Sequence, residues 1–297
     1  MKIWIQTLRL RTLFLSLSCI MMGIFLSASK GFFNFKISAF AILTALFLQI
    51  LSNLANDYGD SIHGADHDLR QGPKRPLQKG EISKRQLKNA IAIFVILSLI
   101  SGTILLYFSF EIIGMISIVS LFIFGLLAIA AAIFYTNGKR PYGYVGLGDV
   151  SVFLFFGLLA VYGTFYIHSG KFILENILPA ASCGLFSVAV LNINNMRDID
   201  SDRIAGKKSI PVRLGFDKSK IYHYILISMA CIISLIFLFE NYFSFKISLV
   251  FLSVLLFVYH MIKVKKTKDK QQLDPLLKEL SLSIFLFVIV FGLAIMQ

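Results

Sequence analysis

Long apolar runs recur along the whole chain, and each is close to the ~20 residues that an α-helix needs to cross a bilayer. No run shows the alternating polarity of a transmembrane β-strand, so an α-helical bundle is predicted instead of a barrel. Only 15% of the residues are charged, whereas soluble domains carry about 25%. Nine spans are predicted, at residues 12–28, 37–55, 90–109, 112–135, 148–168, 176–195, 221–240, 246–262 and 280–296. We therefore expect an all-α polytopic membrane protein, with the whole chain, 1–297, forming one transmembrane domain.

Basic residues are distributed very unevenly between the two sides of these predicted spans. Of the 29 Lys and Arg, one side has only Lys30, Lys36, Lys171 and Lys246, and all the others lie on the opposite side. Because cytoplasmic connections carry an excess of Lys and Arg, we predict an N-terminus inside and a C-terminus outside. The family resemblance described below implies that the membrane is a bacterial cytoplasmic (inner) membrane. The net charge of +13 then reflects topology beside a lipid bilayer, and nucleic acid is not needed as a partner.

Two of the inside connections carry the same arrangement of polar residues. In each, a span ends in Asn and an Asp pair follows: Asp57 and Asp60 are three residues apart, and Asp198 and Asp202 are four apart. On a helix each pair would share a face, whereas Asp200 would point away from its neighbours. Four predicted spans separate the two copies, so both should lie on one side of the membrane. Solvated charges would explain one such loop, but they explain two matched loops poorly.

Clustered carboxylates at the inner ends of helices repel one another and lose hydration, and a divalent cation removes this cost. Mg²⁺ takes one or two carboxylates and completes its octahedron with waters and phosphate oxygens. Each acidic motif is followed by basic residues, including Arg75 and Lys207, that suit the remaining charge of a diphosphate. The paired motifs therefore predict a Mg²⁺–diphosphate site better than a bare ion site.

A third inside loop, 135–149, combines glycines with basic and aromatic residues. Glycines let backbone approach a ligand closely, and Lys139 and Arg140 suit an anion. Tyrosines such as Tyr142 suit an aromatic ring or a carbocation. Asp149 opens the next predicted span, where a carboxylate could act in the site or could simply stabilise the helix N-terminus.

These three motifs resemble those of the UbiA superfamily of intramembrane prenyltransferases, and within it the branch that acts on 1,4-dihydroxy-2-naphthoate. The segments that carry the resemblance are NLANDYGD at 53–60, RPYGYVGLGD at 140–149 and NNMRD at 194–198 with Asp202 and Lys207. The similarity extends from about Arg11 to Gly215 and agrees with nine helices. Two positions depart from the superfamily pattern: Gly64 stands at the last Asp of the first motif, with Asp66 two residues later, and Asn195 stands at the first Asp of the second.

The resemblance implies a Mg²⁺-dependent transfer of a polyprenyl group from its diphosphate to a small aromatic acid, with loss of CO₂ to give demethylmenaquinol in menaquinone biosynthesis. No obligate protein partner is implied, and the active site would face the cytoplasm. The implied metal ligands are Asn56, Asp57, Asp60, Asn195, Asp198 and Asp202. The implied substrate-binding residues are Arg75, Lys139, Arg140, Tyr142 and Lys207, and the implied catalytic residues are Asp60, Asp198, Lys139, Arg140 and Asp149.

Two other functions are weighed against this one. The nearer alternative is the same chemistry on 4-hydroxybenzoate or homogentisate, against which the third loop favours the naphthoate branch. The more distant alternative is a cation-coupled transporter, which predicts acidic residues near mid-membrane and helices broken by Gly or Pro. Here the acidic residues sit at the inner ends of the spans, which argues against transport.

Overall fold

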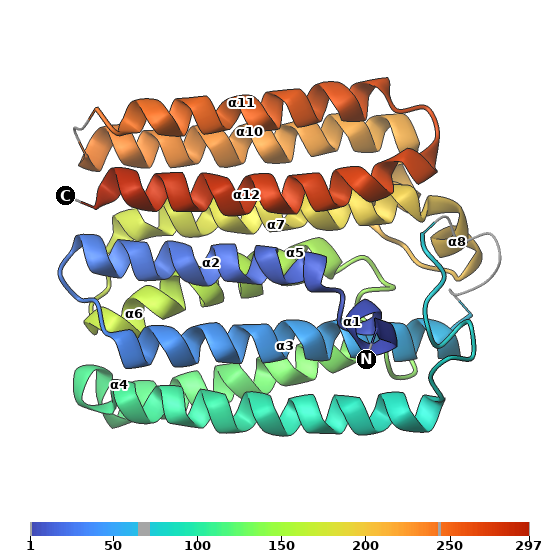
Figure 1. Cartoon of the computed structure of the whole chain (residues 1–297), viewed down its shortest axis with the longest axis horizontal. Helices are drawn as coiled ribbons and strands as arrows, with labels where there is room; N and C mark the ends of the chain where they lie inside the picture. The colour runs from blue at the N-terminus through green and yellow to red at the C-terminus, as the bar shows by residue number, and fades with distance from the viewer. Residues whose placement is uncertain (1, 65–71, 243–244, 297) are drawn as a thin grey trace.

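The computed structural model describes residues 2–64, 72–242 and 245–296, and the regular structure in these ranges is helical throughout (Figure 1). Within them, eight helical segments are long and apolar enough to cross a membrane, which confirms the predicted fold class. Five consist of one helix each: α2 (Leu10–Ser29), α3 (Phe35–Ile62), α4 (Lys84–Phe134), α10 (Phe216–Asn241) and α11 (Ile247–Lys266). Two more begin with a short 3-10 turn, which is followed by α7 (Ile177–Arg197) or α12 (Leu273–Ile295). The eighth joins α5 (Gly148–Val152), the π-helix η1 (Phe153–Tyr162) and α6 (Gly163–Ser169).

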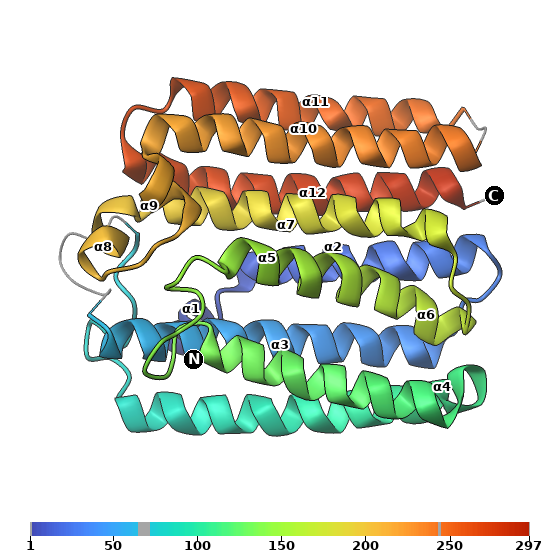
Figure 2. The same ribbon diagram turned by 180° about the vertical axis from the view of Figure 1, so that it is seen from behind.

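The short helices lie between or before these long ones. They are α1 (Lys2–Leu8), η2 (Leu174–Asn176), α8 (Ile199–Ile204), α9 (Ile210–Leu214) and η3 (Lys270–Gln272). The connections that carry α8 and α9 and residues 72–83, which precede α4, gather at one end of the bundle (Figure 1, right; Figure 2, left). The two acidic motifs are therefore at the same end of the bundle, as predicted from the four spans that separate them. Which end faces the cytoplasm stays a prediction.

Helix α4 takes the place of two predicted spans, 90–109 and 112–135. Its backbone is non-helical at Gly114, where φ is 72° and ψ is 170°, and the chain reverses there so that the two halves run side by side (Figures 1 and 2). Glycine adopts this φ without the clash that a Cβ would cause. The predicted span 112–135 therefore begins two residues before the reversal at Gly114, because almost no polar loop marks the reversal in the sequence. The number of membrane crossings stays a prediction.

Several helices extend beyond the apolar runs that predicted them. Helix α3 continues from the predicted end at residue 55 to Ile62, and α12 begins at Leu273 instead of residue 280. At the N-terminus of α4, Ser83 and Gln86 form a capping box, which satisfies backbone N–H groups that have no partner within the helix. These polar extensions carry the acidic residues discussed below, so they decide where those side chains point.

The two halves of the bundle are filled differently. Between α7, α11 and α12, Phe186 stacks on Phe257 with ring centroids 4.6 Å apart, and Phe287 lies edge-on to both. Such aromatic packing makes this half a solid core.

On the other side, η1 approaches α7 so closely that a Cβ on Gly157 would lie 2.7 Å from the Ala180 carbonyl oxygen. The half built by α2 to α7 encloses a cavity, and the site lies there.

The predicted topology can be tested by single-cysteine labelling in a chain that lacks Cys19, Cys183 and Cys231, which are all buried. Ser83→Cys, Lys218→Cys and Glu175→Cys place thiols at exposed positions. A membrane-impermeant maleimide is expected to reach the first two only from the cytoplasmic side and the third only from outside, because the basic connections stay inside. Labelling of positions 83 and 218 from opposite sides would separate the two acidic motifs and rule out a shared site.

Candidate active site

The first acidic motif lies on the last two turns of α3, where Asn56, Asp57 and Asp60 are all helical. Asp57 is 2% exposed and Asp60 is 5% exposed, so both carboxylates are almost completely removed from water. Buried carboxylates need charged or hydrogen-bonding partners, since an isolated ion inside a protein is strongly unfavourable. Each partner found here is a cation or a hydroxyl donated by another segment of the chain.

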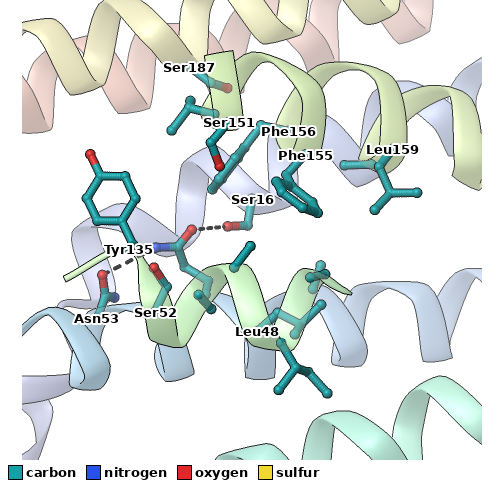
Figure 3. A pocket seen from close by; sticks show the side chains of 18 of the residues that line it. Ser16, Leu48, Ser52, Asn53, Tyr135, Ser151, Phe155, Phe156, Leu159 and Ser187 are labelled. Carbon is teal, nitrogen blue, oxygen red and sulfur yellow. Dashed lines mark hydrogen bonds between the residues drawn. The ribbon is translucent and has the colours of Figure 1, made fainter. Parts of the chain in front are cut away.

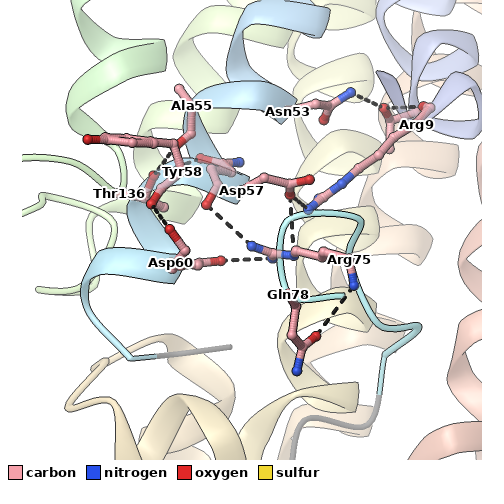
Figure 4. Close-up of polar contacts among 12 residues, drawn as sticks. Arg9, Asn53, Ala55, Asp57, Tyr58, Asp60, Arg75, Gln78 and Thr136 are labelled. Atoms are coloured by element: carbon pink, nitrogen blue, oxygen red, sulfur yellow. Dashed lines mark hydrogen bonds and ion pairs between the residues drawn. The ribbon is translucent and has the colours of Figure 1, made fainter. Parts of the chain in front are cut away.

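Two arginines contact this motif (Figure 4). Arg75 lies with Nε 3.3 Å from Asp57 Oδ1 and Nη2 2.8 Å from Asp60 Oδ2, so one guanidinium joins both carboxylates of the predicted pair. Arg9, between α1 and α2, forms an ion pair with Asp57 through Nη2. Its backbone is left-handed, with a φ of 51°, and a non-glycine residue in this region is strained by about 1 kcal/mol or more. The ion pair with Asp57 is one contact that holds Arg9 in that conformation.

Lys207 joins the two acidic motifs. Its Nζ lies 3.1 Å from Asp60 Oδ1 and 2.9 Å from Asp202 Oδ1, although these carboxylates are far apart in the sequence. Burial alone would lower the pKa of Lys207, but the two carboxylates outweigh burial and raise the pKa above that of an ordinary lysine. Lys207 therefore carries its positive charge at any physiological pH. One cation thus touches a carboxylate from each motif.

Tyr144, from the third loop, completes the surroundings of Asp60. Its hydroxyl donates to Asp60 Oδ1 at 2.8 Å, and Lys207 Nζ lies 4.8 Å from the centre of its ring. Burial, together with the negative charge of Asp60, raises the pKa of the Tyr144 hydroxyl, which keeps its proton. Tyr144 belongs to the sequence motif at 140–149 but was not among the predicted site residues. Its position within that motif is the only feature of the sequence that points to a role in the site.

The second motif is divided by a break in the helix. Helix α7 ends at Arg197, and α8 begins at Ile199, so Asp198 is a cap residue with a φ of −98° and a ψ of 14°. Asn195 and Asp202 line the cavity, whereas Asp198 is not among the lining residues. The carboxylate of Asp198 is instead bound by Arg197, with Nη2 2.6 Å from Oδ2. Asp202 N still donates to the Asp198 carbonyl oxygen at 2.9 Å, so the helical spacing holds over this turn, but only Asp202 of the pair lines the cavity.

The cavity has a volume of about 420 Å³ and a polar end next to these charges. Most of its wall is apolar, and Phe155, Phe156 and Leu159 of η1 contribute to that wall (Figure 3). Phe122 and Leu126 of α4 also line it and are 42% and 43% exposed. The cavity therefore extends from a charged end along apolar side chains of η1 and α4.

A chain of polar side chains runs along the α2–α3 wall of the cavity. Ser16 Oγ donates to Gln49 Oε1 at 2.6 Å, and Gln49 Nε2 donates to Asn53 Oδ1 at 3.3 Å (Figure 3). Asn53 Nδ2 in turn donates to Thr12 Oγ1 at 2.9 Å. Polar groups at membrane depth are uncommon and mark functional sites. Gln49, a polar residue inside an apolar run, is the feature of the sequence that points to this polar chain, and it was not among the predicted site residues.

The family model for the UbiA prenyltransferase family matches residues 16–275. The chain belongs to the UbiA prenyltransferase family. This confirms the resemblance on which the sequence motifs were interpreted, and both acidic motifs lie inside the matched range.

Two bacterial relatives are similar over most of their length. The 1,4-dihydroxy-2-naphthoate octaprenyltransferase of Haemophilus influenzae is 42% identical, over 100% of this chain and 96% of that protein. The 1,4-dihydroxy-2-naphthoate octaprenyltransferase of Escherichia coli is 46% identical, over 77% of this chain and 74% of that protein.

Solved structures of UbiA homologues share the fold. The apo structure of the homologue from Aeropyrum pernix K1 has a TM-score of 0.70 at 20% identity, covering 95% of this chain and 98% of that one. The homologue from Archaeoglobus fulgidus bound to GPP and Mg²⁺ has a TM-score of 0.65 at 18% identity, covering 99% of each chain. At these identities the comparison establishes the fold alone.

The donor atoms of this UbiA site fit Mg²⁺. Within the described parts of the chain, no three Asp, Glu, His or Cys side chains converge into a ready metal centre. However, Asp60 and Asp202 each present an oxygen to a single cation, the Nζ of Lys207, and Asn195 lines the same space. Two carboxylates per ion are what Mg²⁺ uses when phosphate oxygens and water complete its shell. The oxygen donors are therefore suitable in type and number.

Other predicted residues lie elsewhere in this UbiA chain. Lys139 and Arg140 are exposed and do not line the cavity. Asp149 also lies outside the lining and accepts a hydrogen bond from Tyr222 Oη at 2.8 Å. Tyr142 does line the cavity, but its hydroxyl donates to the Ala131 carbonyl oxygen at 2.9 Å. Asp66 is outside the described residues.

Proposed function

We propose that this chain transfers a polyprenyl group from its diphosphate to 1,4-dihydroxy-2-naphthoate, with loss of CO₂, to give demethylmenaquinol. The observation that carries the proposal is Lys207 joining Asp60 to Asp202 at the charged end of an apolar cavity. The acceptor is supported by the two relatives, 42% and 46% identical, whose names specify it. The charged end suits a diphosphate, and the apolar wall suits the chain attached to it.

Diphosphate binding would be shared between cations and a metal. Asp60, Asp202 and Asn195 are positioned to hold Mg²⁺, which when bound would supply charge neutralisation for the leaving diphosphate. Lys207 and Arg75 would add fixed positive charge at the same end of the cavity. Because Lys207 stays protonated, its contribution does not depend on pH in the physiological range. Charges arranged in advance stabilise a developing anion without reorganisation.

The reaction breaks the allylic C–O bond of the donor and forms one C–C bond to the acceptor ring. The electron pair of the broken bond leaves with the diphosphate, and the acceptor loses its carboxyl group as CO₂ while a proton passes to the released diphosphate. Tyr135, Phe155 and Phe156 line the cavity, and aromatic rings can stabilise an allylic cation. The apolar wall excludes water that would otherwise capture it.

We further propose that the whole chain, 1–297, acts as one domain in the bacterial cytoplasmic membrane, with the charged end of the cavity facing the cytoplasm. The basic connections at that end support this orientation. No obligate protein partner is required, since one chain supplies both acidic motifs.

The acceptor can be tested with purified protein, a polyprenyl diphosphate, Mg²⁺ and a panel of aromatic acids, with the products identified by mass. We expect prenylation of 1,4-dihydroxy-2-naphthoate with a mass that shows loss of CO₂. No product is expected in EDTA, and activity should return with added Mg²⁺. Faster prenylation of 4-hydroxybenzoate or homogentisate would overturn the acceptor assignment, and full activity after chelation would overturn the role of the metal.

A further inference from the structure

Arg197 is buried beside the second acidic motif and uses different edges of its guanidinium for different partners. It is 1% exposed. Nε and Nη2 donate to the two carboxylate oxygens of Asp198 at 3.0 and 2.6 Å. Nη1 points the other way and donates to Asp274 Oδ1 at 2.5 Å. The guanidinium therefore binds two carboxylates on two edges at the same time.

Asp274 belongs to α12, a helix that carries none of the three sequence motifs. It lies in the first turn of α12, where a carboxylate is favoured by the helix dipole. It also pairs with Arg11 of α2, whose Nη1 is 3.0 Å from Asp274 Oδ2. One turn further along α12, Leu277 lines the cavity. The ends of α2, α7 and α12 thus meet around Asp274, next to the proposed metal site.

The two-edge contact has a consequence for Asp198. Asp274 fixes one edge of a guanidinium that is 1% exposed, so the other edge is held toward the carboxylate of Asp198. Without Asp274, the charge of Arg197 would lose one of its two carboxylate partners in a buried position, which is unfavourable, and Arg197 would no longer be fixed beside Asp198.

We propose that Asp274 is a positioning residue for the second acidic motif: it holds Arg197 from behind, and Arg197 in turn orients the carboxylate of Asp198 in that motif. This inference rests on the proposed function, in which the two motifs bind a divalent cation and a diphosphate. Asp274 touches neither substrate and acts through Arg197.

The test measures cation binding directly. Mn²⁺ binding to the full-length protein is followed by electron paramagnetic resonance in the presence of inorganic diphosphate, and wild type is compared with Asp274→Asn. Loss of a residue that supports metal ligands typically weakens metal affinity about 10- to 100-fold, so we expect at least about tenfold weaker Mn²⁺ binding. The Mg²⁺ concentration for half-maximal prenyl transfer should rise in parallel, with kcat at saturating Mg²⁺ changed by less than about threefold.

Two matched variants separate this role from general electrostatics and from helix packing. Asp217→Asn removes a carboxylate from the same position of another first turn, in α10, where the side chain is 93% exposed. Arg11→Gln removes the other partner of Asp274 and leaves the contact with Arg197 intact. Neither is expected to weaken Mn²⁺ binding more than about twofold, and Asp274→Glu, which restores the charge, should recover part of the affinity.

Arg197→Lys provides a second route if Asp274→Asn does not fold, as judged by size-exclusion profile and thermal midpoint. Lysine keeps the charge but loses the two-edged fork, so it should weaken Mn²⁺ binding by a similar factor. Wild-type affinity in Asp274→Asn or Arg197→Lys, or an equal loss in Asp217→Asn, would overturn the inference. A wild-type protein that binds no Mn²⁺ with diphosphate would overturn the proposed function itself.

Discussion

Asp60→Asn and Asp202→Asn are each expected to lower the rate of prenyl transfer by about two orders of magnitude or more, because groups that stabilise developing charge contribute 10²–10³-fold to catalysis. Both carboxylates contact Lys207 and face the same end of the cavity, so each substitution disables the same ionisation step. Initial rates with purified variants and saturating substrates measure the effect. The double variant should be little slower than the slower single variant, since residues that act as a unit are strongly non-additive.

Asp200→Asn is the matched control for this experiment. Asp200 lies between Asp198 and Asp202 in the second acidic motif, but its carboxylate pairs with Lys270 at 2.5 Å and is not part of the cavity wall. It should retain most of the wild-type rate. Comparable losses in Asp200→Asn and Asp202→Asn would mean that the structure assigns the wrong carboxylate to the site. Near wild-type rates for both Asp60→Asn and Asp202→Asn would exclude a diphosphate site between the motifs.

The fold was predictable because apolar length is a strong physical signal, whereas helix ends and reversals are weak ones. Every predicted span overlaps an observed helix. The boundaries failed where polar residues continue a helix, as at the end of α3, and where a reversal needs only a glycine, as at Gly114. Hydrophobicity cannot detect either case, since a polar residue near a helix end still makes its backbone hydrogen bonds.

The site was predictable where spacing along one helix decides the geometry. Asp57 and Asp60 lie on continuous helix, and Arg75 contacts both. The same reasoning was incomplete for Asp198 and Asp202, because Asp198 lies at the break between α7 and α8, where Arg197 binds its carboxylate, and only Asp202 lines the cavity. The convergence of both motifs was correctly expected from the even number of predicted spans that separates them.

Contacts between distant segments were the part that sequence could not supply. Arg9 precedes the first span and pairs with Asp57, and Asp274 begins the last helix and pairs with Arg197. No local pattern links these residues, because each pairing depends on how whole helices pack. The roles of Lys139 and Arg140 stay predictions, because this basic pair is exposed and lies outside the cavity wall.

Lys207→Met is expected to have the second large effect, on stability as well as on activity. The Lys207 side chain is 16% exposed and lies between the carboxylates of Asp60 and Asp202, so its removal leaves the nearly buried Asp202 without this cation, while Asp60 keeps its pair with Arg75. Breaking a buried pair from one side costs about 3–5 kcal/mol, and the thermal midpoint should fall accordingly. Because the pKa of Lys207 is raised, its contribution is complete at neutral pH and is lost only as the pH rises through that raised pKa.

Added Mg²⁺ distinguishes the two roles of this lysine. A divalent cation that the two carboxylates can bind should raise the thermal midpoint of Lys207→Met more than that of wild type, since it replaces the missing charge. Activity should stay at least about 100-fold below wild type at the same Mg²⁺ concentration, because the fixed positive charge beside the diphosphate is still absent. Lys208→Met is the matched control, an exposed neighbour that should leave midpoint and rate almost unchanged. Equal Mg²⁺ stabilisation of wild type and Lys207→Met would show that Asp60 and Asp202 do not share a cation site.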